Sequence, residues 1–425
     1  MRTAAAALAA GLWMAASGGG LCQEIPYAPI AAPTAGLSVC PGGLCQADAL
    51  GGVFEALLAT EAGRRARPVH ILQIGDSHTA GDRITGKMRS ALQARFGKAG
   101  RGVLPPGVPY AGYAPYQVQV GATGWVSELA ALQPPGGTWA QSVGLSGVRA
   151  TGSGDAVMRF VLDRGAEATN IGICGRALGT GPGLSVEAND TITGLDFNGP
   201  EPEGEVCHEI LLQQSTTMVR LIPVGRGVLL DSVRLDGIRP GVVLSNLGRV
   251  GATLRDLAAR DEAIVATELA MWRPSLIVLA FGTNDGFEDG LDPVAYATLL
   301  RGQVDRMRRL APAASLLILG APEALRSGAA GGCSADGVRA PPPGLAVVRD
   351  VQRRVAADMG VAFWDWHGRM GGDCSADRLA TVGEPLMRGD RVHFTSAGAD
   401  WIGGVLSDDL MAAYDGWKAA RGGVE

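Results

Sequence analysis

The second half of this sequence alternates between short apolar runs and longer segments with a helical period. Leu276–Phe281 contains no polar residue, which is typical of a strand buried on both faces of a parallel sheet. Further strands are predicted at 316–319 and 361–364, and helices at 253–272, 293–310, 345–359 and 397–414. Such alternation requires right-handed crossovers, so it restricts this part of the chain to an α/β architecture built on a parallel sheet.

The same alternation of helix and buried strand occurs once near the N-terminus. A helix is predicted at 47–64, Val69–Ile74 is a predicted buried strand, and a second helix follows over 82–96. Apolar residues recur every four positions in the second helix, at Ile84, Met88, Leu92 and Phe96. One strand with its helices cannot bury its own faces. The segments 24–109 and 241–425 are therefore predicted to form one three-layer α/β domain.

The segment 110–240 has a different pattern of residue types. Many Gly and Pro residues separate short alternating runs, of which 156–162, 185–188 and 227–235 are examples. Short strands divided by turns are typical of a β-sandwich or barrel. We therefore predict an all-β, sandwich-like domain inserted into the α/β domain.

Residues 1–23 are typical of a secretory signal peptide. Arg2 supplies a positive charge, Ala4–Ala16 is uncharged and mostly apolar, and small residues follow. This run is shorter than the ~20 apolar residues of a membrane span, and no later run reaches that length uninterrupted. We predict export to the periplasm or cell envelope, with no transmembrane segment in the mature chain; the alternative is a disordered Ala-rich tail. Lipidation at Cys22 is disfavoured because the bulky Leu21 precedes it.

Export would permit disulfides among the seven cysteines. With Cys22 set aside, several pairings are possible. Pairing in sequence order joins Cys40 to Cys45, Cys174 to Cys207 and Cys333 to Cys374. The alternative is that some of these cysteines are free buried thiols.

Charge and motif content disfavour several classes of protein. The formal net charge is −5 and the longest basic run is Arg64–Arg67, whereas a nucleic-acid binder concentrates Lys and Arg on one surface. The cysteines lack the C-x2-C spacing of zinc sites, and the sequence has no H-E-x-x-H or G-x-S-x-G motif. We predict no nucleic-acid partner, no metal and no cofactor.

Two polar motifs follow predicted buried strands, where ligand sites of open α/β sheets form. Gly75-Asp76-Ser77 comes after Val69–Ile74 and places a serine hydroxyl beside the N–H groups of a helix start. Gly282-Thr283-Asn284-Asp285 comes after Leu276–Phe281, and its Asn284 amide could donate to a developing oxyanion. Taken alone, each motif is also compatible with an ordinary turn.

Two further motifs precede predicted helices. Asn246–Thr253 contains Gly251, which has no side chain to shield its N–H from a ligand; the alternative is a plain loop capped by Thr253. Asp390-Arg391-Val392-His393 separates a carboxylate and an imidazole by three residues. Asp390 can therefore hold Nδ1–H of His393 and leave Nε2 free as a base.

Together and in this order, the four motifs resemble the sequence blocks of the SGNH hydrolases, also called GDSL-type esterases. The resemblance covers the α/β segments and says little about the residues between them. It implies a flavodoxin-like parallel sheet, with Ser77 as nucleophile, His393 as its general base and Asp390 orienting the imidazole. It also implies an oxyanion hole made by the N–H groups of Ser77 and Gly251 and by the Asn284 side chain.

Longer stretches are similar to bacterial peptidoglycan O-acetylesterases of this family. They are Ile74–Asp82, Phe363–Trp366 with Met370–Gly372, and Asp390–Thr395. Those enzymes are exported and carry an inserted β domain resembling carbohydrate-binding modules. The resemblance implies a serine esterase that removes O-acetyl groups from peptidoglycan or another cell-surface polysaccharide through an acetyl-serine intermediate, without a cofactor.

Three other functions are compatible with the sequence. An O-acetyltransferase would use the same triad, and acetate release without a sugar acceptor would distinguish the two. A lipolytic or thioesterase member of the family would show a preference for longer acyl chains. A non-catalytic glycan-binding protein on the same scaffold is disfavoured because every motif residue is present.

Other polar residues have no assigned role. His78 could touch substrate or face solvent, His208 is expected at the surface of the β segment, and His367 could line a sugar subsite or pack among tryptophans. Glu323 and Glu384 have no partner that the sequence reveals.

Overall fold

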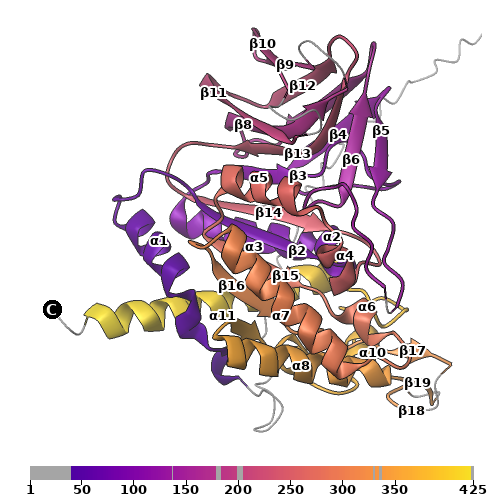
Figure 1. Ribbon diagram of the computed structural model, residues 1–425. Coiled ribbons are helices and arrows are strands. Elements are labelled where there is room, and N and C mark those ends of the chain that lie inside the picture. Colours follow the sequence, from indigo (N-terminus) through magenta and orange to yellow (C-terminus); the bar gives the residue numbers. More distant parts are fainter. Residues whose placement is uncertain are drawn as a thin grey trace, which may run out of the picture.

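The structure is a computed structural model (Figure 1). It describes residues 40–135, 137–178, 183–198, 204–328, 331–334 and 337–422. The predicted signal peptide at 1–23 and the question of lipidation at Cys22 lie outside the described residues.

Six strands form the central, mostly parallel sheet. In the order in which they pair, they are β1 (Leu44–Cys45), β20 (Ala362–Trp364), β16 (Ser315–Leu319), β15 (Leu276–Ala280), β2 (Val69–Gly75) and β14 (Val242–Gly248). The β1–β20 pair is antiparallel and the other pairs are parallel. Gly75, the last residue of β2, is in register with Ala280 on one side and Gly248 on the other. The carboxyl ends of these three strands therefore lie side by side.

Helices cover both faces of this sheet (Figure 1). One face packs against α1 (Gly51–Glu61), α3 (Arg83–Phe96) and α11 (Ser396–Gly422). The other packs against α4 (Leu254–Ala258), α5 (Glu262–Trp272), α7 (Pro293–Leu310) and α8 (Pro343–Met359). Strand β2 serves both cores, since Val69 and Ile71 point into the first and Leu72 and Ile74 into the second. This is the three-layer arrangement expected from the alternating pattern.

Two antiparallel sheets, at the top of Figure 1, are formed by the stretch between α3 and β14. The first pairs β10 (Thr191–Leu195), β9 (Leu184–Ala188), β12 (Met218–Pro223), β7 (Val157–Leu162) and β4 (Val118–Thr123). The second pairs β11 (Val206–Thr216), β8 (Ala168–Ala177), β13 (Val228–Asp236), β6 (Val148–Gly152) and β5 (Val126–Leu129), with β3 (Gly100–Leu104) also on β13. Phe160 and Leu221 of one sheet share an apolar core with Ile173 and Leu230 of the other. That these sheets form a separate inserted domain with the boundaries 110 and 240 stays a prediction.

Short elements complete the described part of the chain. They are the 3-10 turns η1 (Pro41–Gly43) and η2 (Ala47–Leu50), the helices α2 (Ser77–Ala80), α6 (Thr283–Gly286), α9 (Trp366–Arg369) and α10 (Ser375–Thr381), and the strands β17 (Arg326–Ser327), β18 (Gly331–Gly332) and β19 (Val338–Ala340). Three disulfides join Cys40 to Cys45, Cys174 to Cys207 and Cys333 to Cys374. The pairing in sequence order is thereby confirmed. Among the described residues, no helix is both long enough and apolar enough to cross a membrane.

Two local predictions were wrong. The alternative interpretation of 246–253 as a plain loop is wrong at Asn246, which lies within β14, a strand that pairs with β2 along its whole length. The helix predicted at 253–272 is two helices, α4 and α5. It is interrupted because the Asp261 side chain caps α5, accepting from the N–H groups of Ala263 and Ile264.

A buried ion cluster joins the helix after Ser77 to the antiparallel sheets. Asp82 is only 2% exposed. Its carboxylate accepts from Arg89 at 3.0 Å, from Arg101 at 2.6 Å and from the Tyr116 N–H at 2.7 Å. Burial acts to raise the pKa of Asp82, but Arg101 and Arg89 outweigh it and the pKa is lowered. The charge of Asp82 therefore holds together α3, β3 and the segment that leads into β4.

Asp82→Asn should lower the free energy of unfolding at pH 7 by about 3 kcal/mol, because two buried guanidinium groups lose their counter-charge. A carboxylate with a lowered folded pKa stabilises the protein above its unfolded value of about 3.9, and this contribution is lost as pH falls through the folded value. The difference between wild type and variant should therefore shrink in acid. Urea unfolding at several pH values measures it.

Asp415→Asn is the matched control, because Asp415 forms an ion pair with Arg95 at the surface. Such a pair contributes about 0–1 kcal/mol. Equal losses of stability in the two variants would show that the Asp82 cluster does not join these elements.

Candidate active site

Ser77 stands where β2 ends and α2 begins. Gly75 allows this sharp turn, because a Cβ atom there would lie 2.3 Å from Thr79 Oγ1 and 2.5 Å from the Ala280 carbonyl oxygen. The Asp76 side chain caps α2 by accepting from the His78 N–H at 2.9 Å. The serine hydroxyl is therefore presented at the carboxyl edge of the sheet, on the first residue of a helix.

Ser77, His393 and Asp390 form one hydrogen-bonded chain. Ser77 Oγ lies 3.0 Å from His393 Nε2, and His393 Nδ1 lies 2.8 Å from Asp390 Oδ2. Since an ionised carboxylate only accepts, Nδ1 carries the ring hydrogen and the Nε2 of a neutral ring can accept from the serine. The structure thus brings together the three residues that the sequence places at 77, 390 and 393.

The loop itself fixes the Asp390 carboxylate. Its Oδ1 accepts from the N–H groups of Val392 at 2.9 Å and His393 at 3.0 Å. Partial burial acts to raise the pKa of Asp390, but these N–H groups and the His393 ring outweigh it, and the pKa is lowered. Asp390 therefore stays ionised and faces Nδ1 as an acceptor.

The two other predicted oxyanion donors lie on adjoining segments, Gly251 in a turn and Asn284 in α6. The backbone of Gly251 has φ +79°, a conformation that favours glycine. The Asn284 side chain donates to the carbonyl of Ala252, the next residue, at 2.8 Å. The Arg249 N–H donates to the Gly75 carbonyl at 2.9 Å, so this turn also adjoins the turn of Ser77. The Asn284 amide nitrogen carries two hydrogens, and the one bond that it donates among the described residues goes to the Ala252 carbonyl.

A pocket of about 500 Å³ opens beside the serine and the imidazole. Its walls include Tyr110 from the segment after β3 and Val250, which is 57% exposed. The stretch predicted to be an insertion therefore contributes to the pocket and is not confined to its surroundings. No sequence signal marked Tyr110, because only the tertiary fold brings it to Ser77.

The connection between β5 and β6 packs on α4 and reaches the same turn. Leu132 lies against Gly251, its Cδ1 3.0 Å from where a Cβ would be. The Gln133 N–H donates to Asp256 of α4 at 2.9 Å, and the Gln133 side chain accepts from the Trp139 N–H at 2.6 Å. The Trp139 side chain is left 65% exposed. Leu132, 48% exposed, thus lies at the turn that carries Val250, and Trp139 belongs to the same connection.

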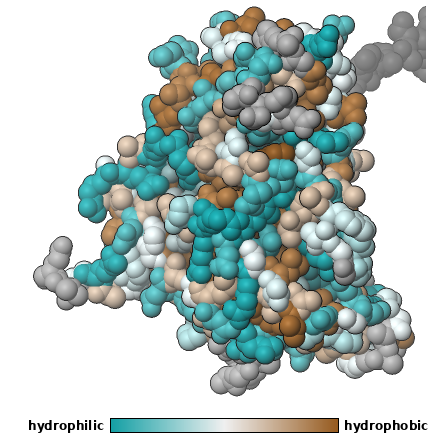
Figure 2. All heavy atoms as spheres, in the orientation of Figure 1, coloured by the Kyte–Doolittle hydropathy of each residue, from teal (hydrophilic) through white to brown (hydrophobic). Residues whose placement is uncertain are grey.

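Exposed apolar side chains are common in this part of the molecule. Figure 2 shows apolar residues at the end formed by the antiparallel strands. Large exposed apolar residues there include Val126, Trp139, Ile192, Leu211 and Met218.

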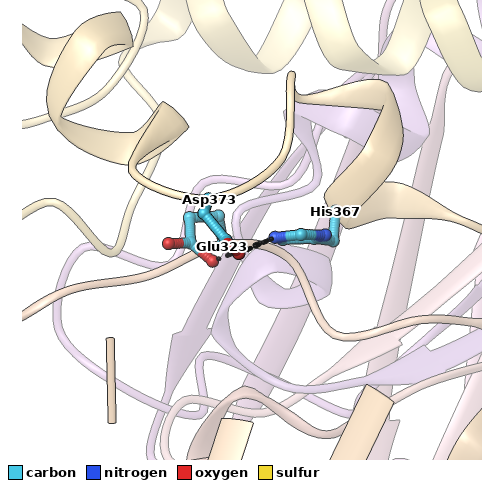
Figure 3. Close-up of side chains that lie close together, drawn as sticks. All are labelled: Glu323, His367 and Asp373. Atoms are coloured by element: carbon cyan, nitrogen blue, oxygen red, sulfur yellow. Dashed lines mark hydrogen bonds and ion pairs between the residues drawn. The ribbon is translucent and has the colours of Figure 1, made fainter. Parts of the chain in front are cut away.

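Glu323, His367 and Asp373 form a second cluster (Figure 3), and their nearest ligand atoms lie within 4.8 Å of one another. His367 Nε2 is 3.0 Å from Asp373 Oδ1 and 3.4 Å from Glu323 Oε2. The same Glu323 oxygen accepts from Arg349 at 3.0 Å, so a metal ion would compete with a guanidinium. The cluster is thus built around the ion pair of Glu323 and Arg349. Glu323 has partners that the sequence did not reveal, and His367 is not among the residues that line the Ser77 pocket.

The other unassigned histidines differ in burial. His78 is 7% exposed and is among the residues that line the Ser77 pocket, so it is not a surface residue. His208 on β11 is partly exposed and lies 2.6 Å from the Asp196 carbonyl. Glu384 is exposed.

Comparisons with known proteins bear on the family of this chain. Residues 229–401 match the model of the GDSL-like lipase/acylhydrolase family. A solved structure described as a peptidoglycan O-acetylesterase in action is similar with a TM-score of 0.74 and 25% identity, covering 88% of this chain and 99% of that one. By both findings, this chain is similar to the SGNH hydrolases of the GDSL type. It is a carboxylic ester hydrolase, and it is similar to that O-acetylesterase along nearly its whole length.

Other solved structures match more weakly. A putative GDSL-like lipase from Parabacteroides merdae has a TM-score of 0.30 and 18% identity, covering 41% of this chain and 73% of that one. A family two carbohydrate esterase from Cellvibrio japonicus has a TM-score of 0.28 and 12% identity, covering 74% and 98%. The comparison with curated proteins gave no match.

Proposed function

We propose that this chain is an exported serine esterase that removes O-acetyl groups from peptidoglycan or another cell-surface polysaccharide. The observation that carries the chemistry is the chain Ser77–His393–Asp390, with links of 3.0 and 2.8 Å at the rim of a pocket. The substrate class is supported by the likeness to a peptidoglycan O-acetylesterase at 25% identity.

In the proposed reaction, Ser77 Oγ attacks the acetyl carbonyl while His393 Nε2 takes its proton. The negative charge that develops on the carbonyl oxygen is stabilised by the N–H groups of Ser77 and Gly251 and by the Asn284 amide. His393 then returns the proton to the sugar oxygen, which leaves. Water, activated by His393, attacks the acetyl-serine and releases acetate. Asp390 holds the ring and stabilises its charged form.

Location outside the cytoplasm is supported by two features. The sequence of residues 1–23 is typical of a signal peptide. Three disulfides join the six described cysteines, as is common in oxidising compartments. The proposed location is the periplasm or cell envelope.

We further propose that the antiparallel sheets form an inserted domain that grips the glycan. Two observations support this: Tyr110 lines the Ser77 pocket, and the connection that exposes Leu132 and Trp139 reaches Gly251, next to Val250 of the pocket wall. A ring face suits the apolar face of a sugar, so a polymer held there would orient its acetyl ester at Ser77.

A covalent acetyl-Ser77 should accumulate transiently with an activated acetyl ester, because deacylation is a separate step. Rapid-quench mass spectrometry should find one acetyl group on the peptide that holds Ser77. Ser77→Ala should abolish acetate release, and wild type should release acetate without a sugar acceptor. Label on another residue would refute the mechanism.

Asn284→Ala should lower kcat by about 10²–10³-fold and change KM little, because the amide acts on charge that develops in the transition state. Steady-state kinetics with nitrophenyl acetate measures both constants, and urea unfolding checks that the variant is folded. A raised KM with wild-type kcat would assign Asn284 to ground-state binding instead.

Trp139→Ala should raise KM for O-acetylated peptidoglycan about fivefold, since losing ~40 Å² of apolar contact costs about 1 kcal/mol. Hydrolysis of nitrophenyl acetate should be unchanged, because a small ester does not reach the indole. Ile192→Ala is the control, a 70% exposed apolar residue on β10. Equal effects on both substrates would mean that this connection shapes the catalytic centre rather than the glycan site.

A further inference from the structure

The residue after the nucleophile, His78, is buried between the two catalytic segments. Its side chain is 3% exposed. Nδ1 lies 3.3 Å from Asp76 Oδ1, and Nε2 lies 2.9 Å from the carbonyl oxygen of Val392, the residue before His393. The ring therefore links the turn of Ser77 directly to the loop of its base.

Both ring nitrogens of His78 face atoms that only accept hydrogen bonds. A neutral imidazole has one N–H, so it could satisfy either the carboxylate or the carbonyl, but not both. An imidazolium donates to both. The geometry thus requires the charged form if the two contacts are made together.

The charges around this ring favour the same form. Asp76 faces it from the cap of α2, and Asp390 lies near it on the loop, while the ring of His393 is 5.6 Å away. The uncharged rings of Trp366 and Phe394 also pack against His78, which lines the Ser77 pocket as well. Burial acts to lower the pKa of His78, but Asp76, the Val392 carbonyl and Asp390 outweigh it and raise the pKa.

The loop that His78 holds has an unfavourable backbone conformation. Arg391 has φ +57°, which costs a residue other than glycine about 1–3 kcal/mol unless its surroundings fix it. The Leu325 N–H holds the Arg391 carbonyl at 3.0 Å, and Asp377 holds its guanidinium at 3.0 Å. These two anchors tie the loop to neighbouring segments, whereas the His78 bond ties it to the nucleophile turn itself.

We propose that His78 is a positioning residue that clamps the Asp390–His393 loop onto the turn of Ser77 and keeps Nε2 of His393 on the serine hydroxyl. The inference rests on the proposed roles of Ser77 and His393. It has a second consequence, since a positive charge this close to His393 opposes protonation of that base. Removing the charge should move the acid limb of the pH–activity profile to higher pH.

The test compares His78→Ala and His78→Gln with wild type on nitrophenyl acetate. His78→Ala should lower kcat about 10- to 100-fold with KM within twofold, because the base is no longer held in place. The Gln amide can still donate to the Val392 carbonyl, so His78→Gln should recover most of kcat. Both variants lack the cation. The midpoint of the acid limb in the profile of kcat/KM against pH should therefore move up by about half a pH unit or more.

The control is His367→Ala, which removes another largely buried histidine paired with a carboxylate but makes no bond to the 390–393 loop. Its kcat and pH profile should match wild type. Urea unfolding reports the stability of all variants. If His78→Ala does not fold, the kcat and acid limb of His78→Gln decide the question.

Wild-type kcat and an unmoved acid limb in the folded His78 variants would overturn the proposal. The proposal would also be overturned if the Ala and Gln variants lost kcat and stability equally and the acid limb did not shift. His78 would then have a purely structural role. Ser77→Ala is measured in parallel. Its retention of activity would refute the proposed function, whereas an inactive Ser77→Ala beside an unaffected His78→Ala would refute this inference alone.

Discussion

The register of three parallel strands determines where everything else in this site lies. Gly75 at the end of β2 is in register with Gly248 of β14 and Ala280 of β15. The segments that leave these strands therefore begin side by side, and they carry Ser77, the turn of Gly251, and Asn284. Shifting one strand by a single residue would turn its side chains to the opposite face and separate the three segments. The catalytic edge is thus a consequence of sheet pairing.

The antiparallel sheets are connected to this frame by polar groups. Ser245 of β14 accepts from the Val103 N–H of β3 at 2.8 Å and bonds His70 Nε2 at 2.7 Å. Burial and the nearby Arg234 lower the pKa of His70 to about 3, so it is neutral there. Asp82 makes the second connection, through Arg89 and Arg101. These bonds hold the two parts in one arrangement, and that arrangement lets Tyr110 line the Ser77 pocket and Leu132 lie against Gly251.

Much of the fold was predictable because each of these elements is determined by residues that are close together in the sequence. The apolar run at 276–281, the fourfold spacing from Ile84 to Phe96 and the alternating runs between 110 and 240 all correspond to elements of the structure. Strand β14 escaped prediction because Ser245 and Asn246 interrupt its apolar run. Both have partners that only the fold supplies: Ser245 bonds β3 and His70, and the Asn246 amide donates to Thr79 and Thr85.

The sequence by itself determined the groups whose partners are close along the chain. Asp390 reaches both the backbone and the ring of His393 within one loop, and Asp76 caps α2 through the N–H of His78, two residues away. Tertiary structure alone decided that His393 meets Ser77, that Leu132 lies on Gly251 and that both nitrogens of His78 face acceptors. The physical reason is that a contact between distant segments depends on how whole elements pack, and no local pattern of residue types encodes that position.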